Sequence, residues 1–213
     1  MTQGKFITLE GGEGAGKSTQ LRILSERLSE AGIEVVATRE PGGSPGAEAI
    51  RALLVNGEPD RWSATSETLL MYAARRDHIE RTIRPALEHG AWVISDRFAD
   101  STRAYQGAGG GVAPEFVAAM ETHVLGQTRP DLTLILDLPV ALGLERAGRR
   151  GGGEARFEAK GLAFHQRLRE AFLGIARAEP ERCVLIDALD SPEGVSAAIW
   201  SAVSARLAVG AAT

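Results

Sequence analysis

Residues 11–18 read Gly11-Gly12-Glu13-Gly14-Ala15-Gly16-Lys17-Ser18, and this stretch decides the fold of the chain. It fits the pattern G-x-x-x-x-G-K-[ST]. A short apolar run at residues 5–9 precedes it, and apolar residues at helical spacing follow it over residues 17–31. The glycine-rich segment therefore joins a buried strand to a helix. With a strand before it and a helix after it, the pattern is a specific indication of a phosphate-binding loop.

The same alternation of short apolar runs and amphipathic segments continues along the chain. Strands are expected at residues 5–9, 35–38, 92–95, 132–136 and 183–186, and helices at residues 17–31, 47–54, 66–88, 114–124, 139–149, 160–178 and 192–207. Because parallel strands need crossover connections, this order predicts a three-layer α/β fold, with a parallel sheet covered by helices on both faces. The glycine-rich residues 107–111 and 151–153 are interpreted as mobile loops beside the functional site.

The length and the charge balance narrow the possibilities further. With 213 residues, the chain is expected to form a single domain over residues 1–213. Its 24 Lys and Arg against 28 Asp and Glu leave a net charge of -4, so neither nucleic acid nor an acidic membrane is an expected partner. The single cysteine, Cys183, excludes an internal disulfide and suits a reducing compartment. With no leader and no long apolar run, the cytoplasm is the predicted location.

The loop at residues 11–18 has the chemistry of a phosphate site. Its glycines let successive backbone N–H groups converge, and the following helix adds its positive N-terminus. Lys17 can reach the outer phosphates of a nucleoside triphosphate, while the Ser18 hydroxyl and the Asp96 carboxylate are the predicted ligands of Mg²⁺. The predicted triphosphate-binding residues are Gly11, Gly12, Glu13, Gly14, Ala15, Gly16, Lys17, Ser18 and Thr19.

Charged residues follow four of the predicted strands. They are the phosphate loop itself, the pair Arg39-Glu40, the pair Asp96-Arg97, and Asp137. Ligands of an open parallel sheet bind beyond the carboxyl ends of its strands, so these residues are expected in one crevice. Each alone could be the first solvated position after a strand. Asp137 is interpreted as a cap for the helix that follows it.

Two further segments could complete the site. Met71 and Arg75 lie four residues apart on one predicted helix, which puts an apolar side chain and a guanidinium on one face. This arrangement suits a flat base with a polar edge, although core packing and a surface charge would explain the same two residues. Arg149, Arg150 and Arg156 flank the glycines at 151–153. They form either a solvated charge run or a mobile lid at about residues 148–158.

Four segments together resemble a known family. They are the loop at residues 11–18, Arg39-Glu40-Pro41-Gly42-Gly43, Met71-Tyr72-Ala73-Ala74-Arg75, and Asp96-Arg97-Phe98 with Ala104-Tyr105-Gln106-Gly107. Many families share the phosphate loop, whereas the E-P-G-G and D-R-(Y/F)…S-x-x-A-Y-Q segments are far more specific. On these motifs the chain resembles the bacterial type of thymidylate kinase with lid arginines, over nearly its whole length. The resemblance implies a P-loop nucleoside-monophosphate kinase fold, the reaction of MgATP with dTMP to give ADP and dTDP, and a homodimer.

The resemblance also implies roles for individual residues. Glu13 would meet the sugar 3′-hydroxyl and Arg97, while Arg97 and Arg39 would steady the acceptor phosphate. Tyr105 would sit where a 2′-hydroxyl would otherwise project. The other implied substrate residues are Glu40 and Arg51 at the phosphate end, Met71 against the base, and Arg75, Thr102 and Gln106 at the thymine edge.

This sequence departs from the family pattern at three places. Met71 stands where the family usually has a stacking Phe, and its polarizable side chain can still lie against a ring. Thr102 replaces a more usual Ser or Asn and keeps a hydroxyl. Relatives with a basic residue inside the phosphate loop lack lid arginines, but residues 13–15 here contain none, so the catalytic arginines are expected in the lid. Ala155 precedes Arg156 in place of a more usual Asp, which leaves Arg149, Arg150 and Arg156 as alternatives.

The predicted chemistry needs no general base. A phosphate monoester acceptor is largely dianionic at neutral pH, so catalysis rests on positioning and on charge stabilisation by Lys17, Arg97, Mg²⁺ and the lid arginines. A deoxynucleoside kinase is the nearest alternative, and Glu13 or Glu40 would then have to act as its base. Adenylate and guanylate kinases lack the E-P-G-G and A-Y-Q segments. A nucleotide-binding switch without efficient transfer is the alternative from another class.

Overall fold

A computed structural model describes residues 4–58, 60–150, 155–158 and 160–209, with the backbone alone at Arg150, Ala155 and Glu158. Within these residues, five strands form one parallel sheet in the order β2-β3-β1-β4-β5. The α/β fold class predicted from the sequence is thereby confirmed. The strands are β1 (Phe6–Gly11), β2 (Val35–Arg39), β3 (Trp92–Asp96), β4 (Leu132–Asp137) and β5 (Cys183–Asp187).

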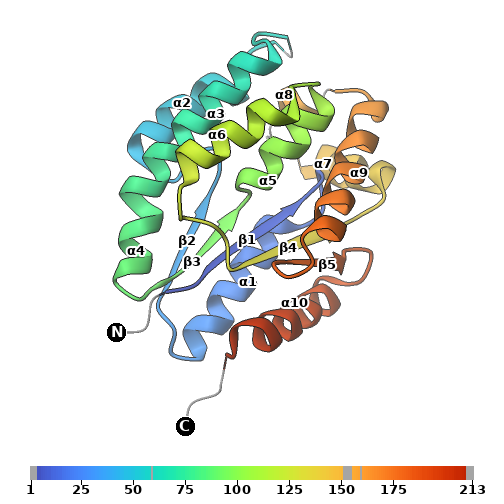
Figure 1. Cartoon of the computed structure of the whole chain (residues 1–213). Coiled ribbons are helices and arrows are strands. Elements are labelled where there is room, and N and C mark those ends of the chain that lie inside the picture. Colours follow the sequence, from blue (N-terminus) through green and yellow to red (C-terminus); the bar gives the residue numbers. More distant parts are fainter. Residues whose placement is uncertain (1–3, 59, 151–154, 159, 210–213) are drawn as a thin grey trace.

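Helices cover both faces of the sheet, as Figure 1 shows. Helices α1 (Lys17–Glu30) and α10 (Pro192–Leu207) pack on one face, and α3 (Ala64–His78), α6 (Pro114–Leu125) and α9 (Leu162–Ala178) pack on the other. None of the helices in the described residues is long and apolar enough to cross a membrane. The remaining elements are α2 (Pro45–Val55), α4 (Arg84–Glu88), α5 (Ala99–Thr102), α7 (Val140–Arg150), α8 (Ala155–Glu158) and the π-helical segments η1 (Ile79–Ile83) and η2 (Arg103–Gly109).

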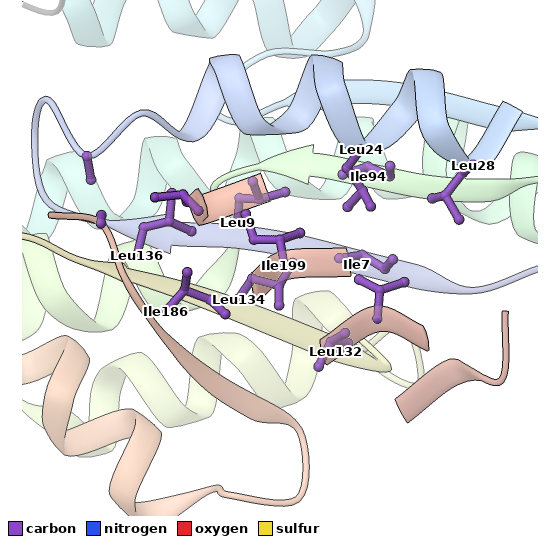
Figure 2. Packing of buried hydrophobic residues seen from close by; sticks show 14 of the residues in the cluster. Ile7, Leu9, Leu24, Leu28, Ile94, Leu132, Leu134, Leu136, Ile186 and Ile199 are labelled. Atoms are coloured by element: carbon purple, nitrogen blue, oxygen red, sulfur yellow. The ribbon is translucent and has the colours of Figure 1, made fainter. Parts of the chain in front are cut away.

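Strand β1 shows why the sheet needs helices on both sides. Successive side chains of a strand point to opposite faces, and every residue of β1 is buried. Ile7 and Leu9 pack beneath Leu24 of α1 and Ile199 of α10, which Figure 2 shows from close by. Phe6 belongs to the cluster on the opposite face. A strand without a polar face is stable in water only between two layers of helix.

The long helix predicted at residues 66–88 is not regular along its length. It begins at Ala64, where the Ser63 hydroxyl caps the backbone N–H of Ser66 at 3.1 Å. It then widens into the π-helical turns of η1 before ending as α4. Pro85 at the start of α4 supplies no backbone N–H and its ring crowds the preceding turn, which accounts for the wider winding there.

The interpretation of residues 107–111 as a loop is wrong for its first half. Residues 107–109 are the last turn of η2, and the helical pair α5 and η2 was not predicted at all. Residues 99–109 carry small and polar side chains without apolar residues at helical spacing, so their helical conformation leaves no periodic signal. The helix α8 was not predicted either. The other predicted helices and strands are present, and their ends differ from the predicted ones by at most two residues.

The carboxyl ends of the parallel strands meet at one edge of the sheet. In the register of β1 and β3, Leu9 pairs with Asp96, and in that of β2 and β3, Arg39 pairs with Asp96. The phosphate loop leaves β1 at the same edge. The charged residues that follow different strands therefore come together, as the parallel order requires.

Candidate active site

The loop between β1 and α1 packs closely against the start of α7. Gly14 has a φ of 67°, and a Cβ there would lie 2.0 Å from the carbonyl oxygen of Gly143. A Cβ on Gly143 would in turn lie 2.4 Å from the carbonyl oxygen of Glu13. The glycine at each position is what lets the two backbones approach so closely. Helix α7, which leads toward the predicted lid, is thus in direct contact with the loop.

Lys17 is buried within its own loop. Its Nζ donates to the carbonyl oxygens of Gly12 at 2.9 Å and Gly11 at 3.2 Å. Burial lowers the pKa of the Lys17 ammonium, and the nearby Arg97 guanidinium lowers it further, against the pull of neighbouring carboxylates. The amine is therefore positioned at the mouth of the loop, where the outer phosphates of a nucleotide would lie.

The two residues predicted to hold Mg²⁺ lie together. The Ser18 hydroxyl donates to Oδ2 of Asp96 at 2.6 Å, although one follows β1 and the other ends β3. Both line a groove together with Arg39 and Glu48, and these four residues are called the phosphate edge below. A hydroxyl and a carboxylate are oxygen ligands of the kind that Mg²⁺ prefers.

Arg97 has an unusual backbone conformation with a fixed side chain. Its φ is 72°, a left-handed conformation that costs a residue with a Cβ about 1 to 3 kcal/mol. Its Nη1 donates to Gly11 O at 3.1 Å and Ser101 Oγ at 3.2 Å, and its Nη2 donates to Oε1 of Glu13 at 3.0 Å. The backbone strain is the kind found where a functional side chain must be aimed precisely.

Glu13 accepts hydrogen bonds from two predicted site residues on the same oxygen. The Tyr105 hydroxyl donates to Oε1 at 2.5 Å, beside the Arg97 contact. Burial alone would raise the pKa of Glu13, but the charges of Arg97 and Lys17 and the Tyr105 hydrogen bond lower it to about 2. Glu13 is therefore anionic at neutral pH, and its low pKa makes it a weak proton acceptor.

A pocket with about 330 Å³ of empty space, part of it open to solvent, lies beside these residues and is called the nucleoside cavity below. Seven of the predicted substrate residues line it. They lie far apart in the sequence, because they come from the segments just after β2 and β3 and from α3, α5 and η2. They are Glu40, Met71, Arg75, Arg97, Thr102, Tyr105 and Gln106, and the remaining lining residues are Pro41, Phe98, Ser101 and Phe157.

Arg75 is the most constrained residue of the nucleoside cavity. Its Nε donates to Oε2 of Glu40 at 2.7 Å, and its Nη2 donates to Phe98 O at 3.0 Å and to the Thr102 hydroxyl at 3.1 Å. Its Nη1 is buried without a hydrogen-bond partner in the described part of the chain. A buried guanidinium with one unused donor nitrogen, beside a cavity, is suited to a ligand that offers an acceptor.

The apolar wall of the nucleoside cavity is made of Met71 and aromatic rings. The ring of Tyr105 meets that of Phe157 edge to face, with centroids 5.7 Å apart. The Arg97 guanidinium lies over the Tyr105 ring, 4.8 Å from its centroid. Met71 stays half-buried and lines the cavity, so the apolar face predicted for residues 71 and 75 is built as expected.

Two residues expected near the substrate phosphate, Arg39 and Arg51, do not line the nucleoside cavity, and neither does Asp137. Arg39 is 56% exposed and donates to the carboxylate of Glu48 at 3.2 Å. Arg51 donates to the carbonyl oxygen of Pro41 at 2.6 Å. Asp137, interpreted from the sequence as a helix cap, accepts two hydrogen bonds from Arg169, at 2.7 and 2.9 Å.

The predicted lid lies partly outside the described residues. Residues 151–153 and the side chain of Arg150 are among those the structure does not describe. Arg149 is exposed and donates to Glu145 at 2.6 Å, one helical turn away. Arg156 is buried and forms an ion pair with Glu67 of α3. The two described lid arginines are therefore in opposite environments, one exposed to solvent and the other held in the protein.

Sequence reasoning missed several residues that build the site. Glu10 of β1 is fully buried, and its carboxylate accepts from Phe98 N at 2.8 Å and Ser101 Oγ at 2.6 Å, which fixes the chain around Arg97. A lone acid inside an apolar strand was the available signal. Glu67 lies four residues before Met71 on α3. Extending the Met71 and Arg75 spacing back by one turn would have found it.

A strand-loop-helix segment of the phosphate-loop type and a partly open cavity with polar lining residues lie side by side at the carboxyl edge of this parallel sheet. That combination of fold and site defines a P-loop nucleoside-monophosphate kinase. The comparisons with known proteins agree, because the family model described as thymidylate kinase matches residues 9–199. The chain belongs to the thymidylate kinase family.

Similar proteins cover almost the entire chain. A thymidylate kinase from Caulobacter vibrioides is 67% identical over 207 residues, which is 97% of this chain and 99% of that protein. A thymidylate kinase from a Bradyrhizobium species (strain ORS 278) is 56% identical over 207 residues, 96% of this chain and 92% of that protein. The crystal structure of thymidylate kinase from Ehrlichia chaffeensis aligns with a TM-score of 0.76 at 34% identity, over 94% of this chain and 99% of that one.

Proposed function

We propose that the chain transfers the γ-phosphoryl group of ATP to dTMP, which gives ADP and dTDP. The observation that supports this most strongly is the nucleoside cavity beside the phosphate loop, which is lined by Arg75, whose buried Nη1 has no hydrogen-bond partner among the described residues. Membership of the thymidylate kinase family agrees with this activity and does not favour the deoxynucleoside kinase or switch alternatives.

Each part of a thymidine nucleotide has a matching group in the cavity. Arg75 Nη1 is a donor for a base carbonyl, and Thr102 and Gln106 are further polar groups at that edge. Met71 offers a polarizable face to the ring. Tyr105 is held against Glu13, so its ring and hydroxyl leave little room for a ribose 2′-hydroxyl.

The phosphoryl transfer is proposed to rest on fixed positive charge. An oxygen of the acceptor phosphate attacks the γ-phosphorus, the bond from the γ-phosphorus to the β–γ bridging oxygen breaks, and ADP leaves with that oxygen. The acceptor oxygen is already deprotonated near neutral pH, so no side chain takes a proton from it. Lys17 is proposed to hold the outer phosphates of ATP, and Arg97 to bind the acceptor phosphate in line.

Mg²⁺ is the proposed cofactor, and Ser18 and Asp96 would hold it. When bound, the ion would neutralise charge on the phosphates and help to align them. The hydrogen bond between Ser18 Oγ and Asp96 Oδ2 supports this assignment, because it brings two oxygen ligands together beside the loop. The proposed triphosphate contacts are the residues from Gly11 to Thr19.

The proposal gives the remaining predicted residues distinct roles. We propose Arg149 and Arg150 as the arginines that reach the transferred group, within a lid at about residues 148–158 of a single domain. The exposure of Arg149 supports this choice, since its carboxylate partner on the same helix can be exchanged at little cost. Arg39 and Arg51 are proposed to act at the acceptor phosphate.

A homodimer in the cytoplasm is proposed as the working form. Leu53 of α2 and Leu69 of α3 are 40% and 47% exposed on two helices that pack together, which supports a covered surface there. Cys183 is a buried free thiol, as suits a reducing compartment. In sedimentation velocity, Leu69→Glu should shift the protein toward monomer, and Leu189→Glu, at an equally exposed leucine elsewhere, should not. An unchanged dimer in the first variant, or a monomeric wild type, would contradict the proposed surface.

The decisive assay offers dTMP and thymidine side by side with MgATP and follows ADP release through coupling enzymes. Rapid turnover with dTMP and none above background with thymidine is expected, because the site has fixed charge for a phosphate acceptor and both candidate bases, Glu13 and Glu40, are paired with arginines. Lys17→Ala serves as the matched control for contaminating kinases. Turnover with thymidine instead of dTMP would point to the deoxynucleoside kinase. No turnover with any monophosphate would point to the switch.

A further inference from the structure

Glu67 is a buried acid that the proposed reaction does not use. It lies on α3, one turn before Met71, with its side chain 8% exposed. Its Oε1 accepts from Nε2 of Gln106 at 2.7 Å, and its Oε2 forms the ion pair with Arg156. Both oxygens of the carboxylate are therefore occupied, one by a residue that lines the nucleoside cavity and one by a residue of α8.

Arg156 is buried and is held by three contacts, one of them with Glu67. Its side chain is 1% exposed, its Nη1 donates to Leu54 O at 3.0 Å, and its Nε donates to Glu58 O at 3.1 Å. Those carbonyls belong to the end of α2 and the segment after it. The guanidinium would have to break three contacts to reach a phosphate, and it would leave Glu67 as a buried unpaired charge.

The Glu67 contact fixes which way the Gln106 amide points. An ionised carboxylate only accepts hydrogen bonds, so the amide atom facing Glu67 must be the nitrogen. The oxygen of the same amide is then the atom that remains for a ligand in the cavity. Pyrimidines differ at this point: thymine and uracil carry a donor N3–H, whereas N3 of cytosine is an acceptor. An amide oxygen accepts a hydrogen bond from N3–H of thymine or uracil, whereas it repels the lone pair on N3 of cytosine.

We propose that Glu67 is a specificity-determining residue which, supported by Arg156, orients Gln106 to select pyrimidine nucleotides with an N3–H over cytosine nucleotides. The proposal rests on the proposed function, because it concerns the acceptor bound in the nucleoside cavity. Glu67 and Arg156 are positioning residues that act through Gln106. The same geometry accepts uracil and thymine alike, so it selects the base edge and leaves the methyl group to other contacts.

The test is the ratio of kcat/KM for dTMP to that for dCMP in wild type and in Glu67→Gln. A neutral amide at position 67 can donate as well as accept, so Gln106 is free to turn and present its nitrogen to the base. The ratio should fall at least about tenfold, with a rise in dCMP turnover, while KM for ATP stays within about twofold. Glu80→Gln, at an exposed acid of η1, is the matched control and should leave the ratio unchanged.

Two further variants keep the test decisive. Arg156→Lys retains a cation beside Glu67 and should keep the ratio within a few-fold of wild type. Gln106→Leu removes the amide and should lower the ratio through loss of dTMP turnover alone, and it decides the matter if Glu67→Gln fails to fold. A folded Glu67→Gln with an unchanged ratio, or with both substrates reduced equally, would overturn the proposal. A wild type that does not phosphorylate dTMP would instead overturn the proposed function.

Discussion

The nucleoside cavity and the phosphate edge use arginine in opposite ways. In the cavity, Arg75 is 2% exposed and pairs with a Glu40 that is itself 4% exposed. At the phosphate edge, Arg39 and Glu48 form an ion pair with 56% and 44% of their side chains exposed. If the proposed roles hold, the base is recognised by groups that are already fixed during folding, whereas the phosphates meet exposed charges that can exchange partners.

His78 is a further buried residue that holds Glu40 in place. It is fully buried, its Nδ1 forms a hydrogen bond with Oε1 of Glu40 at 3.0 Å, and its Nε2 forms another with the Thr38 hydroxyl at 2.7 Å. Glu40 is thus held from two sides, by Arg75 and by His78. A histidine that looks uninformative in the sequence therefore stabilises the acid on which the base-binding arginine depends.

The largest effect is expected from the charges that face both phosphates. Lys17→Ala and Arg97→Ala should each lower kcat by about 10² to 10³ or more, because transition-state charge stabilisation in an enclosed site is lost. Steady-state ADP release measures the effect, with far-UV circular dichroism as the check on folding. Near-normal turnover in either folded variant would remove the basis of the proposed mechanism.

The two arginines of the comparison can be tested as a matched pair. Arg75→Met should lower the free energy of unfolding by about 3 to 5 kcal/mol, because it leaves Glu40 as a buried charge without its partner. Arg39→Met should change it by less than about 1 kcal/mol, because the exposed pair contributes little. Urea denaturation of both variants gives the two values. Similar losses in both would break the distinction between a fixed cavity and an exchangeable phosphate edge.

The contact of α7 with the phosphate loop predicts a smaller but specific effect. Gly143→Ala puts a Cβ 2.4 Å from a backbone oxygen of the loop, so the loop must shift, at a cost of about 1 to 3 kcal/mol in stability and with reduced kcat. Gly148→Ala is the control on the same helix, because nothing lies within 4 Å of its Cβ, and it should be neutral or slightly stabilising. If both variants behave alike in urea denaturation and in kcat, the close contact between α7 and the loop contributes neither to stability nor to turnover.

Glu10 predicts how stability depends on pH. Burial raises the pKa of this carboxyl to about 7, and the neighbouring Asp100 raises it too, against the hydrogen bonds and charge that lower it. In the unfolded chain the group titrates near its ordinary value of 4.5. Between about pH 4.5 and 7 the folded protein therefore holds a proton that the unfolded chain has lost, so the free energy of unfolding falls as the pH rises through this window.

Glu10→Gln cannot titrate and should lack this part of the pH dependence. Urea denaturation of wild type and variant between pH 5 and 8 should show curves that diverge by about 1 to 3 kcal/mol across the window. Comparing wild type with Glu10→Gln also tests how the nucleoside cavity is held in place, because Glu10 accepts hydrogen bonds from Phe98 and Ser101, two of the residues that line it. Parallel curves would mean that Glu10 has an ordinary pKa.

The sequence predicts the parts of the molecule that follow from local patterns. The apolar runs and the glycine-rich loop are enough to predict the parallel sheet. Each strand is recognised from its own apolar residues, and the helix between successive strands indicates that they run parallel. Of the residues that line the cavity, Met71 and Arg75 were placed on one helix face by their spacing, whereas Thr102, Tyr105 and Gln106 were named only through the resemblance to a family.

What the sequence could not predict depends on contacts between distant segments. Arg156 was one of three arginines left as alternatives for the transferred phosphate, and that role stays a prediction. Nothing in the sequence around it reveals that Leu54 and Glu58 offer it carbonyl oxygens. The helical residues 99–109 are stabilised by packing against α9 and α3, not by an apolar period of their own. Such features become visible only when the chain is folded.

The proposed selection of dTMP is tested most directly by initial rates of ADP release with saturating MgATP across a panel of dTMP, dUMP, dCMP, AMP and GMP. The highest kcat/KM is expected for dTMP, with values at least about 100-fold lower for dCMP and the purine nucleotides, because the fixed groups of the cavity fit one base edge. Equal rates across the panel, or a preference for a purine nucleotide, would contradict it.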